Sequence, residues 1–138
     1  MRASAQKRLF FALLLYAAAS LIHFIHNAEF LGDYPRLPST WTRAGVYSVW
    51  LLMTLVGVAG WLLVKRGSQL PGLAVLAVYA GFGLDSLGHY ILAPMSAHSA
   101  GMNSTILFEV TAAALVLVEV ARQMVRRIFI ERHKRVAG

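Results

Sequence analysis

Ionisable and amide side chains gather at the end of the first long apolar stretch of the sequence. His23, His26, Asn27 and Glu29 follow an almost wholly apolar run that begins at Leu9. Titratable groups inside a membrane span are costly, and those that occur usually face a protein interior or a wet cavity. The sequence therefore predicts the location of a functional site before it predicts a reaction.

Two later apolar segments carry further groups of the same kinds. Asp85 and His89 stand four residues apart on one segment, and Glu109 lies near the start of the other. A helix rises about 1.5 Å per residue, which brings all of these groups to the outer half of one membrane. The predicted metal-binding site consists of His23, His26, Asp85, His89 and Glu109.

The spacing of polar and small residues predicts that these groups share one chamber. Residues three or four positions apart lie on the same face of a helix. Such faces would be formed by Tyr16, Ser20, His23 and Asn27, by Gly81, Asp85, Gly88 and His89, and by Thr105, Glu109 and Ala112. We expect all three faces to point inward, because contact of charged groups with lipid costs several kcal/mol.

A divalent metal site is the first chemical interpretation of this set. Imidazole and carboxylate ligands suit zinc, iron, copper or manganese, and helix bundles hold metals between His and Glu side chains of facing helices. The sequence contains neither a Glu-x-x-His nor a His-Glu-x-x-His motif. The predicted cofactor is thus a divalent metal ion with a catalytic or redox-linked role, and the residues do not decide whether the protein is an enzyme.

Three other interpretations stay open. Haem b could be held by one histidine of the first helix and by His89, although haem does not require the nearby carboxylates. Coupled histidines and acids could instead handle protons, or hold a small solute or the head group of a lipid-like substrate. Finally, the same groups could be a structural cluster that pairs helices in a membrane scaffold protein.

The composition indicates the class of protein that positions these groups. Of the 138 residues 58% are hydrophobic and 14% are charged, against about 25% charged residues in soluble proteins. Several apolar runs reach the roughly 20 residues that cross a hydrocarbon core. Cysteine is absent, which excludes disulfides, thiolate metal sites and cysteine nucleophiles. We predict an all-α integral membrane protein with a single membrane domain over residues 1–138.

Four membrane spans and a tail account for the chain. Loops rich in proline, glycine or basic residues separate the apolar runs and are short enough to join neighbours, which predicts an antiparallel four-helix bundle. The predicted spans cover residues 9–26, 44–64, 70–92 and 104–121, followed by a basic helical tail over 122–138.

The basic residues predict the orientation. Eleven of the thirteen Lys and Arg residues lie at the termini or in the 65–69 turn, and the net charge is +7. Positive-inside bias then places both termini in the cytoplasm of a multi-pass cell membrane protein. Because these residues flank spans, we expect the lipid bilayer as the partner, with a possible small or lipid-like substrate, and no nucleic acid. The sequence predicts no oligomeric state.

Several other polar residues receive simpler interpretations. Tyr34 and Trp41 are placed like aromatic anchors at the membrane interface. Glu119 is expected to form an ion pair with Arg122 or Lys65. His98 could act as an outer ligand or lid of the cluster, and His133 is expected to be solvated in the basic tail.

Overall fold

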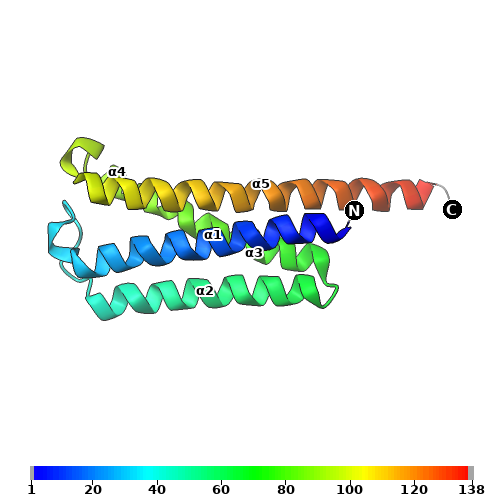
Figure 1. Cartoon of the computed structure of the whole chain (residues 1–138), viewed down its shortest axis with the longest axis horizontal. Helices are drawn as coiled ribbons and strands as arrows, with labels where there is room; N and C mark the ends of the chain where they lie inside the picture. The colour runs from blue at the N-terminus through cyan, green and yellow to red at the C-terminus, as the bar shows by residue number, and fades with distance from the viewer. Residues whose placement is uncertain (1, 137–138) are drawn as a thin grey trace.

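Four long helices run antiparallel in the computed structural model of the chain, as Figure 1 shows. The structure describes residues 2–136, and their side chains over 4–130. The predicted all-helical architecture with four long apolar helices is confirmed. The elements are α1 (Arg2–Glu29), η1 (Leu31–Asp33), α2 (Arg43–Lys65), α3 (Gln69–Leu84), η2 (Asp85–Leu87), α4 (Gly88–Leu92), η3 (Met95–Ala97) and α5 (Ala100–Val136).

Each predicted span lies within a helical segment that is long and apolar enough to cross a membrane. These segments are Ser4–Glu29, Arg43–Lys65, Gln69–Leu92 and Ala100–Ile130. The fourth begins about one turn earlier than predicted, and its helix continues through the predicted tail to Val136. Residues 137–138 and the side chain of His133 lie outside the described part.

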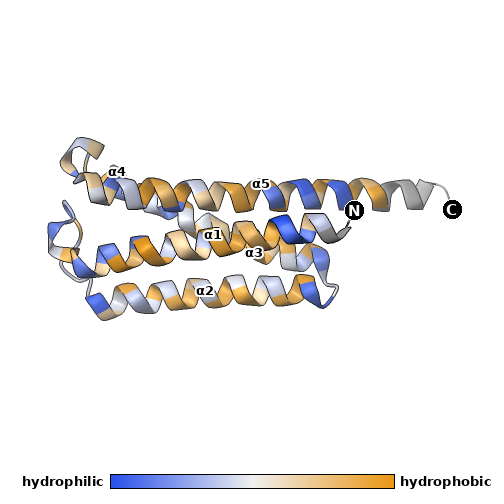
Figure 2. Cartoon of the chain, in the orientation of Figure 1, coloured by the Kyte–Doolittle hydropathy of each residue, from blue (hydrophilic) through white to orange (hydrophobic). Residues whose placement is uncertain are grey.

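Large apolar side chains are exposed along the outside of the bundle. On α2 they include Leu51, Leu52, Leu55 and Val58, each about half exposed or more. Figure 2 shows hydrophobic residues along the helices and hydrophilic ones towards their ends and in the connecting segments. A soluble bundle would cover its outer faces with polar residues, so this surface is typical of a protein in lipid.

The apolar core of the bundle contains close contacts between aromatic rings and glycines. The rings of Tyr16 and Tyr79 lie 4.6 Å apart, and the Tyr16 hydroxyl donates to the backbone oxygen of Tyr79. Gly83 of α3 lies against Tyr16 and Ala113, so that α1, α3 and α5 meet closely there. Small residues allow this approach because no side chain separates the helices.

The 30–42 segment folds back over one end of the bundle. Glu29, at the end of α1, pairs with Arg43 at 2.9 Å and accepts a hydrogen bond from Tyr47, which joins α1 to α2. This closure buries Tyr34, whose residue surface is only 4% exposed. The expectation that Tyr34 is an interfacial anchor is therefore wrong, whereas Trp41 is exposed.

Prediction for helix packing. Gly83→Ala is expected to destabilise the protein by about 1–3 kcal/mol, because an added Cβ would meet Tyr16 at 2.6 Å and Ala113 at 2.8 Å. Gly81→Ala is the matched control, since its Cβ would meet no heavy atom within 4 Å among the described residues. Thermal unfolding in detergent should show a lower midpoint only for Gly83→Ala. Equal midpoints in both variants would contradict the packing described here.

Candidate functional site

The buried face of the third apolar helix sets which of its side chains reach the interior. Its buried residues recur at intervals of three or four and include Gly72, Leu76, Tyr79, Gly83 and Ser86. Asp85 lies outside this face and is exposed. Asp85 thus does not join the cluster, and Ser86, in the short 3-10 segment η2, takes the inward position.

The centre of the site is the carboxyl group of Glu109. The residue is fully buried on α5, and Ser86 Oγ donates a hydrogen bond of 2.5 Å to its Oε2. His23 of α1 is 2% exposed, and its Nε2 lies 3.8 Å from the same Oε2. The burial of His23 and Glu109 agrees with the inward orientation predicted from their spacing.

The hydrogen bond of His23 Nδ1 indicates which ring nitrogen carries the proton. Thr105 donates its only hydroxyl proton to the backbone oxygen of Met102 at 3.0 Å. Thr105 Oγ1 can therefore only accept from His23 Nδ1, which lies 3.3 Å away. We accordingly assign the proton to Nδ1, which leaves Nε2 facing Glu109. The pair then holds a proton either on the Glu109 carboxyl or on His23 Nε2.

Tyr34 lies among the histidines. Its ring centre is 4.8 Å from that of His89, 5.9 Å from that of His26 and 6.5 Å from that of His23. Its hydroxyl lies 3.0 Å from His26 Nδ1 and also forms a hydrogen bond with Thr105. Burial raises the pKa of Tyr34 to about 12, so the hydroxyl stays protonated and available as a donor.

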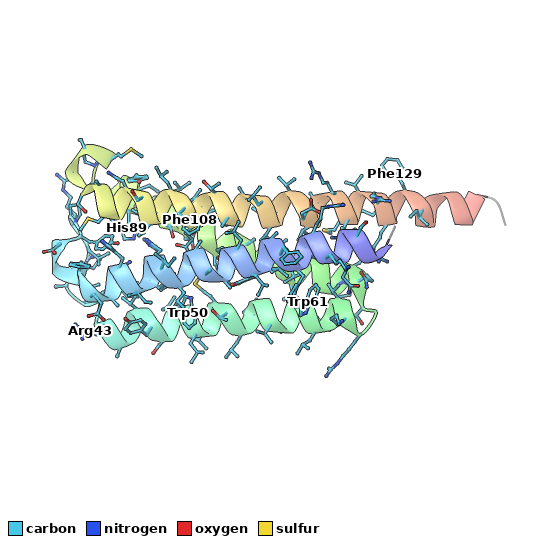
Figure 3. The ribbon with its side chains drawn as sticks, in the orientation of Figure 1. Arg43, Trp50, Trp61, His89, Phe108 and Phe129 are labelled. Atoms are coloured by element: carbon cyan, nitrogen blue, oxygen red, sulfur yellow. The ribbon has the colours of Figure 1, made fainter. Side chains whose placement is uncertain are left out.

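Two further histidines complete the cluster. Asn27 Nδ2 donates to His89 Nε2 at 3.4 Å, and the ring of His89 lies 5.5 Å from that of His23. His98 is buried, with its ring 6.2 Å from that of His89, and it donates from Nδ1 to the oxygen of Pro94. Figure 3 shows His89 at the end of the bundle where the 30–42 and 93–99 segments meet.

Three buried acceptors in this cluster lack a donor among the described residues. They are Asn27 Oδ1, His98 Nε2 and Glu109 Oε1. A buried polar atom without a partner costs about 1–3 kcal/mol, so three in one cluster are not accounted for by packing alone. Ordered water, an ion or a polar ligand can satisfy such atoms, and Ser20 is a further hydroxyl partner of Glu109.

The described residues include no group of three or more His, Cys, Asp or Glu side chains that could hold a metal ion. Tyr34 stands among the imidazoles, and His26 Nδ1 and His89 Nε2 are occupied by hydrogen bonds to Tyr34 and Asn27. Asp85 also points away from the cluster. In this conformation the residues do not fit the predicted metal site. The metal site stays a prediction, and the haem b site does too.

Two residues of the cluster were not predicted as members. Ser86 lies seven residues after Tyr79 and three after Gly83, and this helical spacing is the signal that could have placed it on the buried face. The burial of Tyr34 depends on the path of the 30–42 segment, for which Pro35, Pro38 and the positive φ of Arg36 are the local turn signals. Those signals predict a turn but not the surface against which it packs.

Comparison of the chain with protein-family models, with curated proteins and with solved structures gave no match.

Prediction for Tyr34. The tyrosinate absorbance contributed by Tyr34, measured as wild type minus Tyr34→Phe, should rise only as the pH approaches 12. Because the folded state favours the neutral phenol, this residue's contribution to stability is complete below its ordinary pKa of about 10 and is lost as the pH rises through 12. A difference signal centred near pH 10 would show that Tyr34 is solvated rather than buried among the histidines.

Proposed function

We propose that this chain is a multi-pass integral membrane protein with both termini in the cytoplasm. The four apolar helices, their exposed apolar side chains and the gathering of Lys and Arg at one end of the bundle support this proposal. The histidine cluster then lies in the outer half of the bilayer, at the end opposite the termini.

We further propose that the cluster binds protons and exchanges them with the outer side. The observation that carries this proposal is the buried Glu109 carboxyl, 3.8 Å from buried His23, with no guanidinium or ammonium group among its described partners. A buried carboxylate without a permanent cation is costly in a low dielectric. A neutral carboxylic acid beside a neutral imidazole avoids that cost. The groups around the pair therefore determine where its proton resides, and a change in those groups can move it.

A chain of hydrogen-bonding groups connects this pair to the end of the bundle. From Glu109 it passes through His23, Thr105 and Tyr34 to His26, which is partly exposed. The Thr105 hydroxyl donates to the backbone oxygen of Met102, so passage of a proton between the two histidines requires this hydroxyl to rotate towards Tyr34. Glu109 is the terminal acceptor in this scheme, and Ser86 stabilises its carboxylate form by donating to it.

Exchange is directed to one side of the membrane. The interior between the cluster and the termini is filled mainly by apolar side chains, among them Leu9, Leu13, Leu73, Leu76, Val116 and Val120. Such a core offers no regular series of donors and acceptors to a proton. We therefore propose a proton-binding site open to the outer face rather than a path for protons through the protein.

A small polar ligand is the second candidate function, and the three unpartnered acceptors favour it. Asn27 Oδ1, His98 Nε2 and Glu109 Oε1 would each accept from an amine or hydroxyl group. A ligand with several donors would satisfy these atoms, and its binding would be coupled to the proton on Glu109. A lipid head group or small solute with such groups would enter from the outer side.

Prediction for Glu109. In reconstituted protein, infrared difference spectra between acidic and alkaline pH should contain a carbonyl band of a protonated carboxylic acid that Glu109→Gln removes. Asp85→Asn is the matched control, because Asp85 is a carboxylate at similar depth that is exposed outside the cluster. In D2O the band should shift rapidly in wild type and several-fold more slowly in Tyr34→Phe, which lacks the hydroxyl next to His26.

A carboxyl band that stays constant over the accessible pH range, or that disappears in Asp85→Asn instead, would contradict the proposal. The spectra separate this role from a purely structural one, since loss of stability alone does not remove a titrating carboxyl band.

Prediction for metal removal. The Glu109 band and its exchange should be unchanged after treatment with a chelator, because the donors to Glu109 and His23 are protein groups. Elemental analysis and an optical spectrum of the same sample test the alternatives, since haem would give a strong Soret band. A stoichiometric metal that His89→Ala releases, together with loss of the pH response, would favour the metal site over proton exchange.

A further inference from the structure

A groove lies between α1 and α5 at the end of the bundle that carries the termini. It has a volume of about 360 Å³ and an apolar floor with a polar rim. Its residues are Arg8, Phe11, Ala12, Leu15, Leu115, Val118, Glu119 and Arg122. Phe11 is 65% exposed, so the groove presents apolar surface to the surroundings of the bundle.

An ion triad closes one end of this groove. Glu119 Oε1 lies 3.1 Å from Arg122 Nη1 and 3.5 Å from Arg8 Nε. The predicted pair of Glu119 with Arg122 is confirmed, and Arg8 of α1 joins it. Gln123 also donates to the backbone oxygen of Ala5, which fixes the two helices beside the triad.

We propose that this groove binds an anionic phospholipid of the cytoplasmic leaflet. Each arginine has five N–H donors, of which the contacts with Glu119 use few, and both arginine side chains are more than half exposed. Guanidinium groups bind phosphate oxygens well because their donors form a planar fork. The inference goes beyond the proton site and depends only on the proposed membrane insertion.

The dimensions of the groove suit the first part of an acyl chain. Leu15 lies seven residues from Arg8, and Leu115 seven residues from Arg122, a distance of about 10 Å along each helix. From the end of the bundle that carries the termini, both helices extend side by side towards its middle (Figure 1). A phosphate at the arginines therefore places an acyl chain over Phe11, Leu15 and Val118.

Charge favours an anionic head group over a zwitterionic one. Two arginines and one glutamate leave a net charge of +1 at the triad, and Lys7, Arg126 and Arg127 lie nearby in sequence. Basic residues near a membrane surface attract anionic lipid electrostatically. Figure 2 shows the hydrophilic start of α1 beside a hydrophilic stretch of α5 at this end.

The test uses the full chain in nanodiscs that contain phosphatidylcholine and phosphatidylglycerol. Spin-labelled phosphatidylglycerol should be immobilised several-fold more than spin-labelled phosphatidylcholine by wild type. The double variant Arg8→Gln, Arg122→Gln should lose this selectivity. The control, Lys65→Gln with Arg66→Gln, removes the same charge at the same end outside the groove and should retain it.

A second variant tests the groove without changing charge. Ala12→Phe fills the floor and should reduce phosphatidylglycerol selectivity while leaving all basic residues in place. Equal selectivity in wild type and Ala12→Phe, or equal loss in the Lys65 and Arg66 control, would overturn the proposal and show attraction by surface charge only. Occupation of the groove by a second copy, seen as a dimer that Ala12→Phe disrupts, would overturn it as well.

Discussion

The structure depends on holding one carboxyl group inside an apolar bundle, where Ser86 donates to one of its two oxygens. Glu109 lies on α5, its hydroxyl donor Ser86 lies on η2, and its imidazole neighbour His23 lies on α1. The loss of any partner leaves a buried polar atom, at a cost of about 1–3 kcal/mol. One carboxyl group thus fixes three segments that are far apart in the sequence. Ser86 lies on the buried face of the third helix, from which its hydroxyl reaches this carboxyl group.

Close packing below the cluster supports this arrangement. Gly83 allows the ring of Tyr16 to lie against α3, and Tyr16 in turn donates to the backbone oxygen of Tyr79. The contact lies between the polar cluster and the apolar core, and it holds α1, α3 and α5 at a short separation. A bundle of wider spacing would admit water to Glu109 from below. The one-sided access of the proposed proton site therefore depends on glycine packing as much as on the histidines.

The sequence predicted those features that depend on local periodicity. Apolar runs and their breaks predicted four long helices, and three- and four-residue spacing predicted that His23 and Glu109 face inward. Asp85 was placed wrongly because the inward face of the third segment was drawn through Gly81, whereas the buried face runs through Gly83 and Ser86. Tyr34 was misplaced because its burial results from the folding of a loop onto distant helices, and no local spacing encodes such a contact.

Two buried glutamates of α5 differ in the side chains that surround them, and therefore in their chemical properties. Glu119 pairs with Arg8 and Arg122, whose guanidinium groups stay charged at any pH that the protein meets. Glu109 has a hydroxyl and an imidazole instead, and the imidazole can itself gain or lose a proton. The first carboxylate is suited to a permanent charged surface and the second to proton exchange. Ten residues of one helix, about 15 Å, separate the ion triad from the proposed proton-binding carboxyl group.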